Sequence, residues 1–266
     1  MRRNGKMMLV VAALAMGQAA TARAHDLRVL VARMMAAPGE EDTVYVSYGH
    51  ALPVDQPIDA DWLQDYHVKT PSGSVLTMVK EGTSLQSNVI HVEEQGVYQA
   101  VATQKPAVWT EVVDAKGVHA HVRAAKKSVK EGTVEDAMLI KKYAKALMIS
   151  GPETTTATEP LGHELEIVPT EPSADWKAGR DLHFKVYYRG KTLPSADLVA
   201  TYIGFKPDAA WCYATTADTK GSAVVRPQQA GTWVLRVKTT RPAAREKREE
   251  YNTEVITATL VLEIRP

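Results

Sequence analysis

The sequence predicts an all-β protein built from two β-sandwich domains in series, with at most one short helix. Three observations predict this class. Valine, threonine and tyrosine are plentiful, and short apolar runs alternate with polar residues. Gly, Pro, Asn and Asp separate these runs at short intervals. A Thr- and Pro-rich segment near the middle of the chain divides the strand pattern into two parts.

The chain begins with a segment typical of a secretory signal peptide. A basic start, "MRRNGK", precedes an apolar run, "MMLVVAALAMG", that is too short to span a bilayer. The small residues of "ARA", residues 22–24, match a cleavage site that places the cut before His25. We therefore expect residues 1–24 to be removed and the mature protein to begin at His25 in a bacterial periplasm.

Cleavage also changes the charge of the chain. The leader carries Arg2, Arg3, Lys6 and Arg23 and no acidic residue, so the 32 basic residues of the whole chain fall to 28, against 31 acidic residues. A slightly acidic mature chain gives no electrostatic basis for binding nucleic acid. No later stretch has the apolar length of a transmembrane helix, so we expect a protein that is not embedded in a membrane.

Residues 25–150 carry the strand pattern of the first domain. "DLRVLVARMM" and "DTVYVSYGH" flank a turn signal at Pro38 and Gly39 and form the first predicted hairpin, and further pairs surround "PSG", "EEQG" and "DAKG". Thr133 and Asp136 have the spacing of a helix capping box. We therefore expect "TVEDAMLIKKYAKALMIS" to be a short helix, or one or two helical turns that pass into a strand near "AKALMI".

Residues 151–160, "GPETTTATEP", form the predicted linker, because they include no large apolar side chain that a core could use. The strand pattern then resumes with "HELEIVP" and "DLHFKVYY" and continues to "EVITATLVLEI". About seven strands in roughly 105 residues fit one antiparallel sandwich. We therefore expect the second β-sandwich domain over residues 161–266.

The second half resembles a known family. "PLGHELEIVPTEPSADWKAGRDLHFKVYYRGKTLPSADLVATYIGF" and "TADTKGSAVVRPQQAGTWVLRV" are similar to bacterial periplasmic proteins labelled domain of unknown function 4198, often described as a periplasmic component-like protein of cobalt or nickel transport. In the first half, three features also fit: the Ala-His-Asp at which the leader ends, the Gly49-His50 pair and "QGVYQAVA". The resemblance implies immunoglobulin-like or transthyretin-like sandwiches and a membrane transporter component as the candidate partner. Many members carry a histidine before the last strand, where this chain reads "TTRPAAREKREEYNTE".

His25 is the most distinctive candidate ligand. Once cleavage frees its α-amino group, this nitrogen and the imidazole can chelate one metal ion, and nitrogen ligands of this kind suit Cu, Ni, Co and Zn. In a simple hairpin centred on Pro38 and Gly39, residue 25 faces residue 51 or 52, so His50 lies diagonally beside it at about 7–8 Å. We expect His50 to complete the chelate, an arrangement known in copper proteins as a histidine brace.

His119 and His121 are the second choice for a metal site. "HAH" places two imidazoles on one face of a strand, which can serve a metal and also occurs on ordinary exposed strands. His183 alternates with apolar neighbours, so we expect it to face solvent. The metal is left open among Ni, Co and Cu, because the affinity order favours copper at almost any nitrogen site.

The chain contains no nucleophile elbow, Gly-rich phosphate loop, HExxH or CxxC, so we expect a protein that is not an enzyme. We expect a secreted, periplasmic, transition-metal-binding protein that supports cobalt or nickel uptake or copper handling. Two alternatives stay open. One is an interaction or glycan-binding module that uses no metal. The other is a copper-dependent oxidase, which needs the brace to face an open cleft.

Overall fold

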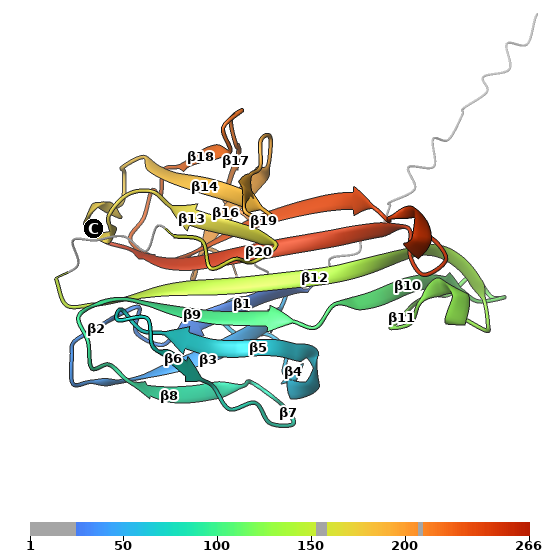
Figure 1. Cartoon of the computed structure of the whole chain (residues 1–266), viewed down its shortest axis with the longest axis horizontal. Coiled ribbons are helices and arrows are strands. Elements are labelled where there is room, and N and C mark those ends of the chain that lie inside the picture. The colour runs from blue at the N-terminus through green and yellow to red at the C-terminus, as the bar shows by residue number, and fades with distance from the viewer. Residues whose placement is uncertain (1–24, 153–158, 207–209) are drawn as a thin grey trace, which may run out of the picture.

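Strands account for nearly all of the regular structure in the computed structural model, which describes residues 25–152, 159–206 and 210–266 (Figure 1). The predicted signal peptide, residues 1–24, and residues 153–158 of the predicted linker lie outside the described residues. Within the described ranges the only helices are four 3-10 turns, at Ala60–Trp62, Lys126–Ser128, Ser173–Asp175 and Arg245–Lys247. The all-β class predicted from the sequence is therefore confirmed.

The described residues before position 153 hold twelve strands. They are β1 (Asp26–Val31), β2 (Met35–Ala36), β3 (Glu41–Gly49), β4 (Ile58–Asp59), β5 (Leu63–Lys69), β6 (Val75–Thr77), β7 (Thr83–Ser84), β8 (Ser87–His91), β9 (Gly96–Gln104), β10 (Ala107–Val113), β11 (His119–Val122) and β12 (Thr133–Ser150). Eight more follow in the described residues after position 158. They are β13 (Leu165–Pro169), β14 (Leu182–Tyr188), β15 (Lys191–Thr192), β16 (Asp197–Tyr202), β17 (Tyr213–Thr216), β18 (Ser222–Val225), β19 (Gly231–Pro242) and β20 (Thr253–Ile264).

A central sheet of eleven strands joins the two halves of the chain. Its main strand order is β17-β16-β19-β20-β12-β9-β5-β6, with β2, β10 and β11 attached beside this path. The junction is the parallel pair β12 and β20, which runs from Met138 opposite Thr253 to Leu147 opposite Leu262. The two predicted domains, residues 25–150 and 161–266, therefore share one continuous sheet, and their division into separate folding units stays a prediction.

Two smaller sheets cover opposite faces of this central sheet, and Figure 1 shows the resulting layers. One has the order β1-β3-β8, and the other consists of β13, β14, β15 and β18. Successive residues of a strand point to opposite faces. Along β12, Ala146 and Met148 lie in the core that includes β1 and β3, whereas Leu147 and Ile149 lie in the core that includes β14. Both faces of this part of β12 are therefore buried.

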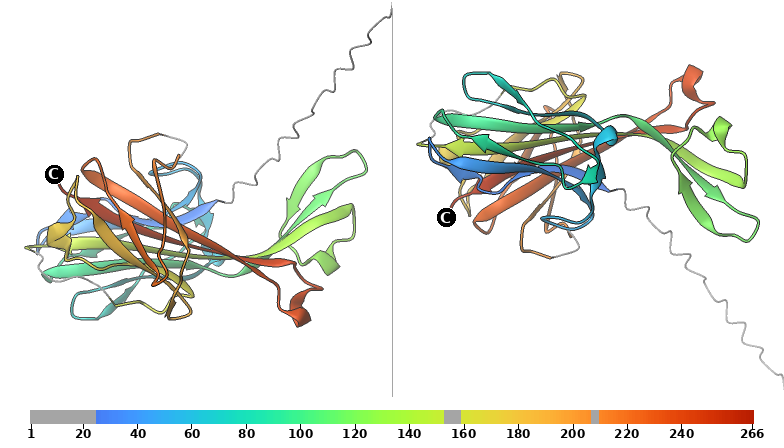
Figure 2. Two further views of the ribbon diagram at one scale, coloured as in Figure 1. Left: turned by 90° about the horizontal axis from the view of Figure 1, so that it is seen from above. Right: turned by 90° about the horizontal axis from the view of Figure 1, so that it is seen from below.

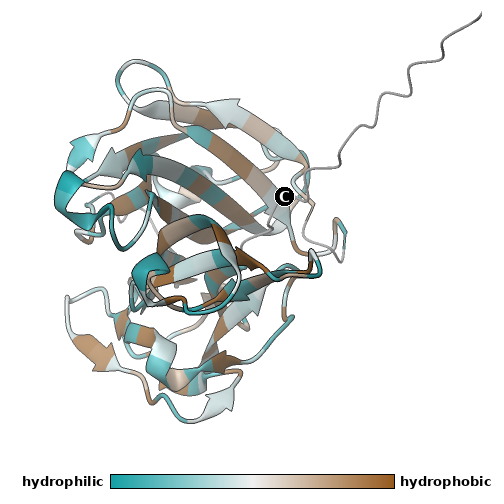
Figure 3. Cartoon of the chain, turned by 90° about the vertical axis from the view of Figure 1, so that its right-hand side faces the viewer, coloured by the Kyte–Doolittle hydropathy of each residue, from teal (hydrophilic) through white to brown (hydrophobic). Residues whose placement is uncertain are grey.

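Each interface between layers has its own hydrophobic core, and each core takes side chains from both halves. The core under β1 and β3 includes Val234 and Val261 from the C-terminal half. The core under β13 and β14 includes Val97 and Leu147 from the N-terminal half. Figure 3, coloured by hydropathy, shows hydrophobic and hydrophilic residues alternating along the strands that supply these cores. Alternation leaves one face of a strand apolar, whereas the part of β12 that is buried on both faces carries a continuous apolar run, Ala146 to Ile149.

The helix predicted at the start of residues 133–150 is wrong, because the whole segment is strand β12. Leu139, Tyr143 and Leu147 recur every four residues, and such residues share a face in a strand as well as in a helix, so this spacing does not distinguish the two. Asp136 does not cap a helix; its Oδ1 accepts hydrogen bonds from the N–H of Ala137 and from Asn252 Nδ2. Pairing with β9, β10 and β20 determines the conformation instead.

The β10–β11 hairpin and the first part of β12 extend beyond the layered body (Figure 2). β10 pairs antiparallel with both β11 and β12. We call these three paired segments the arm, residues 107–140. Ala137 of the arm forms a small hydrophobic cluster with Ala243 and Tyr251. Among the described residues, no helix has the length and apolar character needed to cross a membrane.

Candidate metal site

The first predicted hairpin forms, and its register brings His25 and His50 together. β1 and β3 are antiparallel neighbours, with Asp26 opposite Gly49. Continued by one residue, this register places His25 opposite His50, so the prediction that residue 25 faces residue 51 or 52 is wrong by one or two positions. The connection between the strands is centred one residue earlier than Pro38 and Gly39, which moves His50 from a diagonal to a direct neighbour.

The His25 ring stacks against two aromatic rings of the β3 end. Its centroid lies 4.4 Å from that of His50, with 28° between the planes, and 5.1 Å from that of Tyr48, with 20° between the planes. Tyr48 and His50 are two residues apart and so share one face of the strand. Trp62 meets the Tyr48 ring edge-on at 6.1 Å and continues the aromatic cluster.

A buried lysine contacts this cluster. Lys142 of β12 is buried, its Nζ lies 4.7 Å from the centre of the Tyr48 ring, and it donates a hydrogen bond of 3.4 Å to the Tyr48 hydroxyl. Burial lowers the pKa of Lys142 to about 8. Burial first, and then the charges of His50 and Lys142, lower the pKa of His25. The neutral, ligating form of the His25 imidazole is therefore favoured at near-neutral pH.

Asp26 fixes the start of β1 to both halves of the protein. Its carboxylate accepts hydrogen bonds from Arg28 Nη2 at 3.4 Å and from Arg236 Nη1 of β19 at 3.1 Å. The fully buried Arg28 also donates to the carbonyls of Gly49 and Ala51, each at 3.3 Å. His25 therefore emerges from a network that anchors the first strand at the end of β3 and against the C-terminal half.

The loop after β3 holds His50 in place. Asp55 Oδ2 accepts hydrogen bonds from the backbone N–H groups of His50 and Ala51, and the His50 bond is the main cause that lowers the pKa of Asp55. Gly49 has a φ of 123°, and a Cβ at this position would collide with the Asp55 carboxylate. The Gly49-His50 pair thus has a structural reason: only glycine permits the turn that presents His50.

The nitrogen donors at this end of the hairpin are the two imidazoles, together with the α-amino group that cleavage before His25 would create. The carboxylate of Asp26 is engaged by two arginines. Asp55 uses only its Oδ2 to accept from the two backbone N–H groups. Because the rings stack face to face, one ion bound to both requires a rotation of the half-buried His50 side chain.

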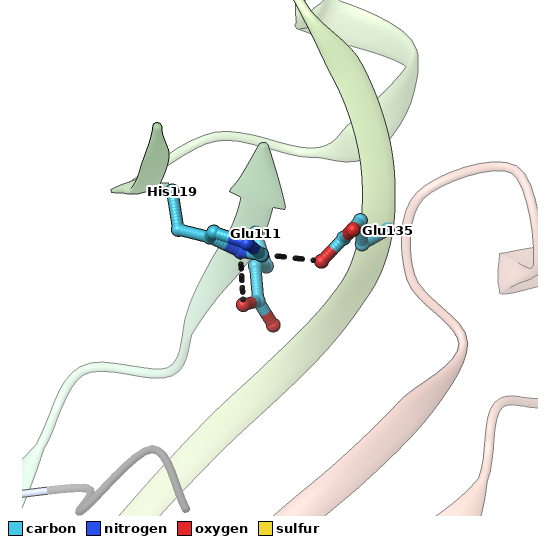
Figure 4. A group of neighbouring side chains, drawn as sticks. All are labelled: Glu111, His119 and Glu135. Atoms are coloured by element: carbon cyan, nitrogen blue, oxygen red, sulfur yellow. Dashed lines mark hydrogen bonds and ion pairs between the residues drawn. The ribbon is translucent and has the colours of Figure 1, made fainter. Parts of the chain in front are cut away.

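The second-choice residues lie at the arm and are not brought together with each other. His119 Nδ1 lies 3.2 Å from Glu111 Oε1 and 3.3 Å from Glu135 Oε2 (Figure 4). His121 is the register partner of Glu111 in β10 and does not belong to this group. No pattern in the sequence indicates Glu111 and Glu135 as ligands, because only the pairing of three strands places them beside His119.

Two further histidines are placed clearly. His183 is exposed, as expected, and its Nδ1 contacts Glu171 Oε1. His163, which received no function in the sequence analysis, stacks on Tyr143 with ring centroids 5.2 Å apart. Burial lowers the pKa of His163 to about 4. His163 is therefore a packed histidine that resists protonation.

A family model described as Domain of unknown function (DUF4198) matches residues 22–241 of the chain. No curated protein matches the chain. The chain is similar to the solved D0-D1 domain of intimin, with 11% identity, 90% of this chain and 97% of that chain covered, and a TM-score of 0.23. It is also similar to an α-2-macroglobulin mutant from Salmonella, with 11% identity and a TM-score of 0.25; the match covers 91% of this chain and 15% of that chain. A third similar structure is that of the fibronectin(III)-like modules of CbhA from Clostridium thermocellum, with 8% identity and a TM-score of 0.19. This match covers 89% of this chain and 94% of that chain.

Proposed function

The chain belongs to the family described as a domain of unknown function (DUF4198), and on this premise we propose that the mature protein is a secreted periplasmic protein that binds one transition-metal ion through His25 and His50. The observation that carries the proposal is the pair of imidazoles at the predicted start of the mature chain, with ring centroids 4.4 Å apart. Cobalt or nickel uptake, or copper handling, is the role we propose for this binding.

The chemistry of binding follows from the donors. Cleavage before His25 gives a terminal amine with an unperturbed pKa of about 8, so a metal ion can displace its proton at neutral pH. The lowered pKa of the His25 imidazole reduces competition from protons at the second donor. His50 supplies the third nitrogen. A set of three nitrogens suits Cu, Ni and Co, with copper bound most tightly.

Calorimetric titration of Cu²⁺ and Ni²⁺ into the mature protein tests the proposal. His50→Ala removes one donor, and one extra alanine before His25 moves the amine away from the imidazole. We expect each change to weaken binding by about tenfold or more, as loss of one ligand does. His183→Ala is the matched control, because it removes an exposed histidine elsewhere. Wild-type affinity in both altered proteins would refute the site.

A second candidate function is favoured by one observation, the aromatic surface beside the histidines. Trp62 and Trp109 meet edge to face at 6.2 Å, both are half-buried, and the Arg123 guanidinium lies 4.8 Å from the centre of the Trp62 ring. Amphipathic rings of this kind serve as contact surfaces for ligands. Binding of a neutral oligosaccharide, read by tryptophan fluorescence and lost in Trp109→Ala but not in His50→Ala, would support a glycan-binding module.

A further inference from the structure

The arm carries a group of metal-ligating side chains apart from His25 and His50. Glu111 lies on β10, His119 on β11 and Glu135 on β12. One ligand atom from each residue lies within 4.8 Å of the other two (Figure 4). Three different strands therefore bring their donors to one point, at the part of the molecule that extends from the layered body (Figure 2).

An irregularity in the sheet creates this convergence. Glu111 pairs with Asp136, but the next residue, Val112, pairs with Val134, so Glu135 is skipped. In an unbroken ladder Glu135 would face Val112, and its side chain would point away from the face that carries Glu111. The bulge instead turns Glu135 toward His119. Bulges re-aim side chains in this way next to functional sites.

The charges in this group are not balanced by the protein. Within the described part of the chain, His119 is the one basic side chain within 4.0 Å of the carboxylates of Glu111 and Glu135. Both carboxylates face the same ring nitrogen, Nδ1, which carries at most one proton. One proton cannot form a good hydrogen bond to two oxygens at once. A cation between the three atoms would satisfy all of them.

The spacing matches the coordination sphere of a small divalent ion. Two ligand atoms at about 2.1 Å from a tetrahedral ion lie about 3.4 Å apart. The two nitrogen–oxygen distances, 3.2 and 3.3 Å, are close to this value, and the two carboxylate oxygens lie within 4.8 Å of each other. We propose that Glu111, His119 and Glu135 form a second metal site, which takes Zn²⁺ and does not depend on the function proposed for His25 and His50. Imidazole and carboxylate are ordinary zinc ligands, and three of them leave the fourth position open to solvent.

The test is a calorimetric titration with Zn²⁺ alone, in the mature protein with His50→Ala as the background, which weakens the first site by removing one of its three donors. This background should still bind one zinc ion. Adding Glu135→Gln, which keeps the shape and removes the charge, or His119→Ala, should weaken zinc binding by about tenfold or more. Zinc should also raise the unfolding midpoint of the background protein and not that of the two variants.

Glu41→Gln is the matched control, since Glu41 forms an exposed pair with His91 at 3.4 Å, and in the described part of the chain no second carboxylate lies within 4.0 Å of that ring. It should leave zinc binding unchanged. The proposal is overturned if the background protein binds no zinc, if both variants bind as tightly as the background, or if Glu41→Gln weakens binding as much as they do. Copper titration of His50→Ala reports separately on the first site, so the two proposals can fail independently.

Discussion

The surroundings of His163 and of His25 both oppose protonation of the imidazole, but the neutral ring has a different role in each case. Burial dominates in each case and lowers the pKa of His163 to about 4. His163 is half-buried and packs on Tyr143, whereas His25 stacks against the rings of Tyr48 and His50 at the expected end of the mature chain. A neutral imidazole is a structural requirement for His163 and makes His25 a better ligand.

The pKa of His163 predicts a loss of stability in mild acid. In the unfolded chain its pKa is near 6.5, so between pH 6.5 and 4 the unfolded state binds a proton that the folded state does not. The free energy of unfolding therefore falls as pH falls through this window, by about 2 kcal/mol at pH 5. Urea unfolding at pH 7 and pH 5 measures how much the free energy of unfolding falls between the two pH values. In His163→Gln this fall should be smaller than in the wild type by about the same 2 kcal/mol. His183→Gln, at an exposed histidine, is the control and should show the same fall in the free energy of unfolding as the wild type. A wild-type fall in His163→Gln would contradict the lowered pKa of His163.

Processing before His25 is a prediction that concerns one peptide bond. Protein taken from the periplasm should begin His-Asp-Leu, because "ARA" precedes His25 and the apolar run ends a few residues earlier. N-terminal sequencing or intact mass measures the start directly. A start at Asp26 or later would remove both donors of His25 and exclude the chelate.

β12 is the element on which the rest of the protein is assembled, and it buries two lysines with opposite surroundings. Lys145 Nζ lies 2.6 Å from Glu166 Oε1, and both side chains are 2% exposed. Lys142 has no carboxylate within 4.0 Å among the described residues and contacts Tyr48 instead. Among the described residues, Lys145 therefore has an ion-pair partner, whereas Lys142 on the same strand has none.

The two lysines should respond oppositely to replacement by methionine. Lys145→Met leaves the Glu166 carboxylate buried without its partner, which should destabilise the protein by about 3–5 kcal/mol. Lys142→Met removes an unpaired buried charge and should be neutral or stabilising by about 1 kcal/mol. Urea unfolding of both variants measures the contrast. Equal destabilisation of the two variants would contradict the assignment of Lys142 as a lysine without an ion-pair partner.

Lys142→Met should also strengthen metal binding at His25 and His50. The Lys142 charge lowers the pKa of His25 by repulsion, and it must repel a bound cation in the same way. We expect about a tenfold gain in Cu²⁺ affinity at low ionic strength. Lys69→Met, at a half-buried position on β5, serves as the control. Unchanged affinity in Lys142→Met would mean that the ion does not lie near this lysine.

At the scale of the whole molecule, the shared central sheet makes the two halves depend on each other. β20 pairs with β12 over ten residue pairs, and Val234 and Val261 complete the N-terminal core. A fragment of residues 161–266 alone would expose this edge and this apolar face. We therefore expect it to unfold at a lower temperature than the whole protein and to bind a hydrophobic dye, measured by circular dichroism and fluorescence. Adding a fragment of residues 25–150 should restore stability, and a fragment as stable as the whole chain would contradict this.

The sequence by itself determined the strand content, the hairpin of β1 and β3, and the proximity of His25 to His50. These features depend on two-residue alternation and on a short connection, both of which are local. Only the tertiary structure decided that residues 133–150 form a strand, that β12 lies beside β20, and that Glu135 meets Glu111 and His119. Each of these depends on pairing between residues far apart in the chain, and on a bulge, for which no local pattern of side chains exists.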